Sequence, residues 1–188
     1  MTVRTFILSI LGGTCFFLLN LQDLKAGKIL SETEGIAWGI QLNNSLSYTG
    51  FSNALVVAAQ KNNLQWYGGP RLLTSDSYVP TKGPWGLNTG LTWFFQGNEK
   101  LRALVNLDYQ LALLKPYNPH NLPERGLNTT HEFNLSYGFT YYFLQNIGIG
   151  NSIGFGQYLE RFHDLQEDII RTYSGYSGLI RIHIHYSF

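Results

Sequence analysis

The feature that most constrains the fold is a strict alternation of apolar and polar residues late in the chain. Between residues 132 and 143 every odd position is apolar or aromatic, whereas the even positions carry Glu, Asn, Ser, Gly, Thr and Tyr. A period of two is the signature of a β-strand whose two faces meet different surroundings, while a helix would give a period near 3.6. The segment therefore predicts a long strand with one apolar face.

The same alternation recurs along the chain and predicts eight strands. It is clear in residues 34–43, 85–95, 101–113, 132–143, 147–160 and 180–188, and weaker in residues 52–60 and 64–72. Tight turns are predicted at 61–63, 96–100 and 144–146, and longer polar loops at 44–50, 73–83, 114–130 and 162–176. Because short and long connections alternate, the chain is predicted to be all-β, an eight-stranded antiparallel up-and-down transmembrane β-barrel.

Composition indicates which face of the barrel points outward. Only 13% of the residues are charged, against about 25% in a typical soluble domain. The polar face consists mainly of Gly, Asn, Ser, Thr and Gln, which suit the crowded interior of an eight-stranded barrel. The continuous apolar rows suit lipid. The alternative is a soluble lipocalin-like barrel, which would point the apolar face inward and the polar face into water.

The N-terminus has the pattern of a secretory signal peptide. Arg4 precedes an apolar core that runs from Phe6 to about Leu19, and Ala26 provides a small residue for cleavage. We therefore expect residues 1–26 to be a signal peptide and residues 27–188 to be the barrel. The single cysteine, Cys15, lies in the predicted signal peptide, so no disulfide is expected in the mature protein.

The last strand carries the one specific motif of the chain. Apolar residues occupy every second position up to a terminal phenylalanine, namely Ile180, Ile182, Ile184, Tyr186 and Phe188. This pattern resembles the C-terminal signal strand of Gram-negative outer-membrane proteins, and the whole plan is similar to the OmpA/OmpX-like eight-stranded barrels. The resemblance implies location in the bacterial outer membrane, contact with outer-membrane lipid and lipopolysaccharide, and recognition by the barrel assembly machinery.

Seven ionisable residues share the inward face of the predicted strands. They are Arg102, Asp108, Glu132, Glu160, Arg181, His183 and His185. An ion or proton path is one interpretation, but paired charges that brace a filled lumen are the expected arrangement for buried ionisable groups. His183 and His185 could begin a metal site, but zinc needs three or four ligands, and Glu160 is the only further candidate nearby. No metal site and no cofactor are predicted.

These patterns indicate a structural or accessory role more than an activity. The formal net charge is +1 and no basic patch stands out, so nucleic acid is not expected as a partner. We expect a membrane barrel with a filled polar lumen that displays surface loops, alone or with other envelope proteins. One alternative is an outer-membrane lipid A-modifying hydrolase or acyltransferase, for which no catalytic residue is predicted: the pair His185 and Ser187 would face inward at the periplasmic end. The other alternative is a narrow pore or ligand-binding barrel.

Overall fold

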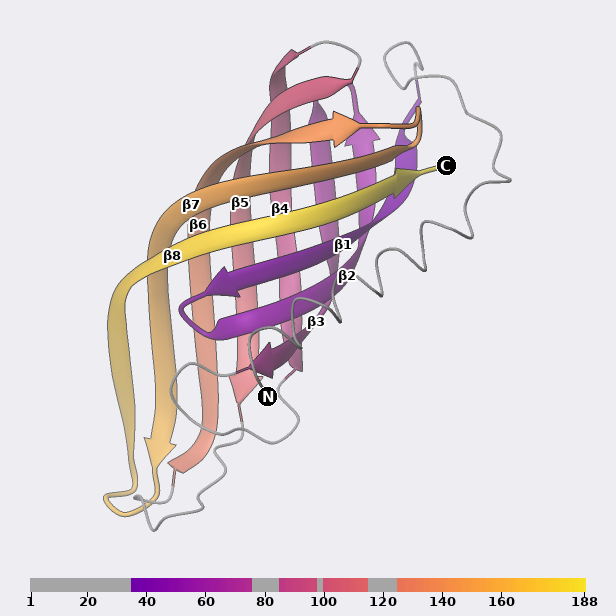
Figure 1. The fold of residues 1–188 in the computed structure, drawn as a ribbon. Coiled ribbons are helices and arrows are strands. Elements are labelled where there is room, and N and C mark those ends of the chain that lie inside the picture. Colours follow the sequence, from indigo (N-terminus) through magenta and orange to yellow (C-terminus); the bar gives the residue numbers. More distant parts are fainter. Residues whose placement is uncertain (1–34, 76–84, 98–99, 115–124) are drawn as a thin grey trace.

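A computed structural model describes residues 35–75, 85–97, 100–114 and 125–188, and it shows a closed eight-stranded barrel (Figure 1). The predicted signal peptide, residues 1–26, lies outside the described residues. The strands are β1 (Ala37–Ser47), β2 (Gly50–Lys61), β3 (Leu64–Ser75), β4 (Trp85–Gly97), β5 (Leu101–Leu114), β6 (Arg125–Tyr142), β7 (Ile147–Asp164) and β8 (Ile169–Ser187). Each strand pairs with its sequence neighbour in antiparallel register, and β1 closes the ring on β8. The predicted up-and-down barrel is confirmed.

Among the described residues, no helix has both the length and the apolar character needed to cross a membrane.

Two of the predicted long loops are wrong. Only Tyr48 and Thr49 connect β1 to β2, so most of the predicted loop at 44–50 belongs to strands. Strands β7 and β8 run on until residues 165–168 form the turn between them, in place of a loop at 162–176. Both segments look like loops in the sequence because they contain polar residues. Ser45 and Ser47 lie on the inner face, where polar side chains are common in a membrane barrel, and residues 169–176 continue the sheet by pairing with β7.

The other two predicted loops are shorter than expected where the structure describes them. Strand β5 ends at Leu114 and strand β6 begins at Arg125, so both ends of the loop predicted at 114–130 belong to strands. The remainder, residues 115–124, lies outside the described residues. Strand β3 extends to Ser75, and the rest of the loop predicted at 73–83 also lies outside them. In each case the strand continues into polar sequence.

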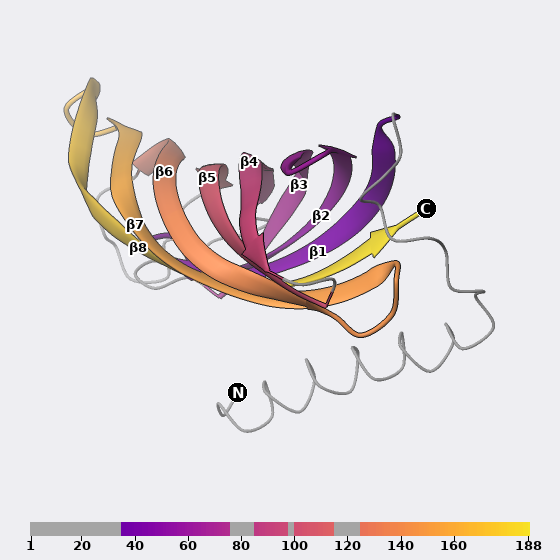
Figure 2. The same cartoon turned by 90° about the horizontal axis from the view of Figure 1, so that it is seen from above.

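Strands β6, β7 and β8 are much longer than the others and project beyond the barrel at the end opposite the C-terminus (Figure 1; seen from above in Figure 2). They have 18, 18 and 19 residues, whereas β1 to β5 have 11 to 14. Pairing of β1 with β8 stops at Leu46 and Ile180, and beyond that point β8 pairs with β7 only. We call the outer ends of these three strands the projecting sheet.

The two faces of the strands are oriented as predicted for a membrane barrel. On β6, Phe133 and Tyr137 are 59% and 57% exposed on the outside, whereas Asn134 and Ser136 between them are 2% exposed. The same contrast on β8 leaves Ile182 half exposed and Arg181 buried. A continuous apolar surface of this kind is unfavourable in water and fits hydrocarbon. This orientation excludes the lipocalin-like alternative, and the barrel is one that spans a membrane.

Glycines on the inner face make room for the large side chains that fill the lumen. A Cβ at Gly90 of β4 would overlap the Tyr67 hydroxyl and the Leu107 carbonyl oxygen. A Cβ at Gly150 of β7 would similarly meet the His183 ring. The lumen is therefore packed by pairing large residues on some strands with glycine on others.

Candidate functional site

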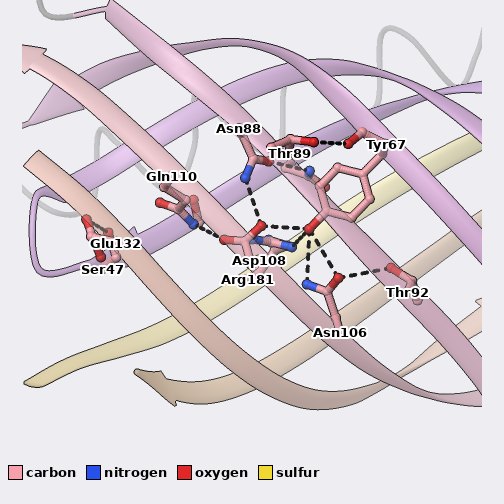
Figure 3. A network of polar contacts seen from close by, with 12 residues as sticks. Ser47, Tyr67, Asn88, Thr89, Thr92, Asn106, Asp108, Gln110, Glu132 and Arg181 are labelled. Atoms are coloured by element: carbon pink, nitrogen blue, oxygen red, sulfur yellow. Dashed lines mark hydrogen bonds and ion pairs between the residues drawn. The ribbon is translucent and has the colours of Figure 1, made fainter. Parts of the chain in front are cut away.

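The candidate site is the lumen, whose middle is occupied by a cluster around Asp108 of β5, which we call the central cluster (Figure 3). The Arg181 Nη2 atom lies 2.6 Å from Asp108 Oδ1, and both side chains are almost fully buried. The Tyr67 hydroxyl donates to the same oxygen at 2.6 Å and accepts from Arg181 Nη1 at 2.8 Å. The amides of Asn88 and Gln110 donate to the carboxylate at 2.8 and 2.6 Å. Four side chains, from strands β3, β4, β5 and β8, therefore converge on one carboxylate.

The central cluster extends to the neighbouring strands through amide side chains. The Asn106 amide donates to the Tyr67 hydroxyl at 3.1 Å, and Thr92 donates to Asn106 at 3.1 Å. On the other side, Asn43 of β1 donates to Asn88 at 2.9 Å. The hydrogen bonds therefore link β1, β3, β4, β5 and β8 across the lumen. Such a connected network stiffens the barrel because every member restrains its neighbours.

A second buried carboxylate, Glu132 of β6, is held mainly by hydroxyl groups. Thr49 donates to Glu132 Oε1 through its hydroxyl at 2.6 Å and its backbone N–H at 3.2 Å. Ser47 donates to the same oxygen, and Ser177 donates to Oε2 at 2.8 Å. Arg71 of β3 lies 4.0 Å away and donates to the Thr49 hydroxyl at 2.7 Å. Glu132 therefore ties the β1–β2 turn to β6 and β8.

Glu160 lies apart from both clusters, at the outer end of the lumen. It accepts a hydrogen bond from the Tyr48 hydroxyl at 3.0 Å and another from the Asn128 amide. The Tyr48 ring also stacks on Tyr158 of β7, with centroids 3.5 Å apart and planes at 7°. Gly175 of β8 leaves the space for Tyr158, because a Cβ there would touch its ring. We call Tyr48, Tyr158 and Glu160 the latch, since they join the short β1–β2 hairpin to the projecting sheet.

The remaining predicted residues lie toward the C-terminal end of the lumen and do not form one group. The His183 Nε2 atom is 2.9 Å from the Thr140 hydroxyl, and His185 Nδ1 is 3.5 Å from the Gln65 amide. Arg102 lies over the Tyr142 ring at 5.4 Å. In the part of the chain that the structure describes, no three His, Cys, Asp or Glu residues are grouped to hold a metal ion.

The lumen between these groups leaves little free space. A cavity of about 10 Å³ lies between the central cluster and His183, lined partly by Gln41, Gln65 and Asn106. A single water molecule needs a cavity of about 10–15 Å³. At this level the described side chains therefore enclose a cavity about the size of one water molecule.

Several residues that complete the site were not predicted from the sequence. Tyr67 is the clearest case, because the weak alternation in residues 64–72 hid its inward position. The inward glycine Gly90 on the neighbouring strand is the signal that could have located it. The roles of Asn88, Gln110 and the hydroxyls of Ser47, Thr49 and Ser177 could not be predicted, because small uncharged polar residues occur on the inner face of every strand. Ser187 is buried and its hydroxyl donates to the Asn146 carbonyl at 3.4 Å, and within the described residues it makes no hydrogen bond to His185.

Comparison with known proteins shows similarity of structure and not of sequence. The N-terminal β-barrel domain of Pseudomonas aeruginosa OprF superposes with a TM-score of 0.53 over 81% of this chain and 97% of that domain, at 14% identity. A major outer membrane protein from Thermus thermophilus gives a TM-score of 0.48 at 15% identity, over 82% of this chain and all of that one. Neisserial surface protein A (NspA) gives 0.45 at 12% identity, over 81% and 96% of the two chains.

No protein-family model matches the sequence, and no curated protein matches it significantly. The likeness to the OprF domain shows the fold: this chain is an eight-stranded barrel of the outer-membrane type.

Proposed function

We propose that the protein is a non-conducting barrel of the bacterial outer membrane that holds its projecting sheet rigidly at the cell surface. The observation that supports a structural role is the filling of the lumen by the central cluster, in which Asp108 is bound by Arg181, Tyr67, Asn88 and Gln110. These contacts connect opposite walls of the barrel, and this supports a lumen that is stiffened and closed to solute. The projecting sheet is then exposed at the cell surface, and the contacts of the latch fix its position relative to the β1–β2 hairpin.

Ion conductance distinguishes this role from the pore alternative. The purified protein, refolded in detergent and added to a planar lipid bilayer in concentrated salt, should give no unitary current steps. A triple variant in which Tyr67, Asp108 and Arg181 are replaced by alanine removes the filling and should conduct. The matched control replaces three outward side chains, Phe133, Tyr137 and Ile182, by alanine and should stay silent. Discrete steps from the unaltered protein would contradict the proposal.

The route to the membrane is part of the same proposal. We infer that residues 1–26 direct export and that the outward residues of the last strand, ending in Phe188, are read by the barrel assembly machinery. The Phe188 N–H donates to the Trp38 carbonyl at 2.9 Å, so the terminal residue also pairs with β1. Replacing Phe188 by alanine should lower the amount of folded protein in the outer membrane of cells but leave refolding in detergent nearly unchanged. Equal losses in both assays would show that Phe188 acts through stability alone.

A further inference from the structure

Three asparagines form a row across the outer surface of the barrel, between strands β7 and β2. The strand register places Asn151 of β7 opposite Ile182 of β8, Ile182 opposite Asn44 of β1, and Asn44 opposite Asn53 of β2. All four side chains point outward, since they alternate with buried lumen residues along their strands. Neighbouring strands are about 4.8 Å apart, so the three amides lie along one short line. We call Asn151, Asn44 and Asn53 the asparagine row.

The asparagine row lies where the barrel should meet hydrocarbon. Asn44 lies within β1, six residues after Trp38 and four residues before Tyr48 at the turn. Asn151 is exposed and has the outward isoleucines Ile149 and Ile153 on either side of it in β7. Within the described residues the Asn44 and Asn151 side chains make no hydrogen bond, and Asn53 makes a long one of 3.4 Å to the Thr74 hydroxyl. An amide without a partner is costly in lipid, because no water is available there to bind it.

Aliphatic side chains surround the asparagine row. Its outward residues in mid-strand are aliphatic: Ile40, Leu42, Leu46, Leu55, Val57, Ile180, Ile182 and Ile184. Outward aromatic residues are more frequent on β6, which carries Phe133, Tyr137 and Phe139, although Phe155 of β7 lies four residues from Asn151. A flat aliphatic surface allows another barrel to approach closely, and polar side chains then hydrogen-bond across the contact.

We propose that this face binds a second copy of the same chain in the membrane. An asparagine side chain both donates and accepts hydrogen bonds, so Asn44 can pair with Asn44 of a second copy. Two barrels inserted in the same direction can be related by a two-fold axis along the membrane normal, which presents the same patch to itself. An axis beside Asn44, the central member of the row, places the amide of one copy against that of the other. The inference rests on the barrel spanning a membrane and is independent of whether the lumen conducts.

Cysteine cross-linking in native membranes tests the contact directly. In a Cys15→Ser background the chain has no other cysteine, so an Asn44→Cys variant can form a disulfide only through the new thiol. Treatment with a mild oxidant should give a covalent species of twice the monomer mass. The control is Leu107→Cys, an outward position in the middle of β5, on the other side of the barrel and 56% exposed. Equal dimer yield from both variants, no dimer from either, or cross-linking of Asn44→Cys to a different protein would each overturn the proposal.

Leucine substitution tests whether the amides provide the affinity. The variant Asn44→Leu, Asn53→Leu, Asn151→Leu should weaken self-association in detergent, measured by sedimentation equilibrium, by about threefold per hydrogen bond and on the order of tenfold or more in total. Gln157→Leu, which removes an outward amide from β7 outside the asparagine row, should leave self-association unchanged. Heat-dependent gel mobility shows that each variant is folded. If the triple variant associates as strongly as the unaltered protein, the row does not form the contact.

Discussion

Replacing Asp108 by asparagine tests the central cluster with the smallest possible change in shape. The substitution keeps the size of the side chain but removes the charge that faces Arg181 at 2.6 Å. It also brings an NH₂ group into a site where the Tyr67 hydroxyl, Asn88 and Gln110 all donate. Breaking one side of a buried ion pair costs about 3–5 kcal/mol, because the remaining charge is left uncompensated. We expect Asp108→Asn to lower the free energy of unfolding by about that amount.

Urea unfolding in detergent or lipid vesicles, followed by tryptophan fluorescence, measures this loss. Asp168→Asn is the matched control, since Asp168 is 90% exposed and pairs with His163 at the surface, and it should cost about 1 kcal/mol or less. The double variant Asp108→Leu, Arg181→Met removes both charges and should be less destabilised than Asp108→Asn. If Asp108→Asn costs no more than Asp168→Asn, the carboxylate is hydrated and the lumen is not filled as described.

Three further predictions concern other parts of the barrel. Glu160→Gln weakens the hydrogen bonds from Tyr48 and Asn128. It should increase hydrogen exchange at the β1–β2 turn and lower the free energy of unfolding by about 1–3 kcal/mol. Unchanged exchange would show that the latch does not hold this turn. Gly90→Ala forces a Cβ against Tyr67 and should lower the free energy of unfolding, measured in urea, by about 1–3 kcal/mol. The control Gly68→Ala makes only ordinary contacts with Thr89 and should be tolerated. Equal effects of the two variants would refute the packing argument. At the β7–β8 turn, partial burial raises the pKa of Asp164, but hydrogen bonds from the Gln166 and Glu167 N–H groups and from Arg171 outweigh it, so this pKa lies below its ordinary value. The ionised Asp164 carboxylate therefore stabilises the turn at pH values above the ordinary aspartate pKa of about 3.9, and this stabilisation is lost as the pH falls further. Hydrogen exchange at the turn should rise in acid, and Asp164→Asn should abolish this pH dependence.

Strand number, order and face could be predicted because alternation is a local property of the sequence. Phe133, Tyr137 and Asn134 show their sides of the sheet without any knowledge of their neighbours. Strand ends could not be predicted in the same way. Ser45, Ser47 and residues 169–176 resemble loop sequence, and only their pairing with neighbouring strands shows that they continue the sheet.

The contacts of the lumen residues were harder to predict than their inward direction. The inward side of a strand can be read from parity, but the partner of Asp108 depends on the stagger of all eight strands. This stagger brings Arg181 and Tyr67, far apart in the sequence, to one carboxylate, and it separates Glu160 and Arg102 from that cluster. Uncharged members such as Asn88 and Gln110 gave no signal, because small polar residues occur on the inner face of every strand.

The orientation of the two faces is the central claim, and a spin-label scan of β6 in lipid vesicles tests it most directly. Labels placed one at a time from residue 133 to residue 140 report collisions with oxygen, which concentrates in hydrocarbon, and with a water-soluble nickel chelate. Oxygen collisions should peak at Phe133, Leu135, Tyr137 and Phe139 and reach minima at the positions between them. Peaks at Asn134 and Ser136 instead, or strong nickel collisions at the odd positions, would contradict a barrel whose apolar face is covered by lipid.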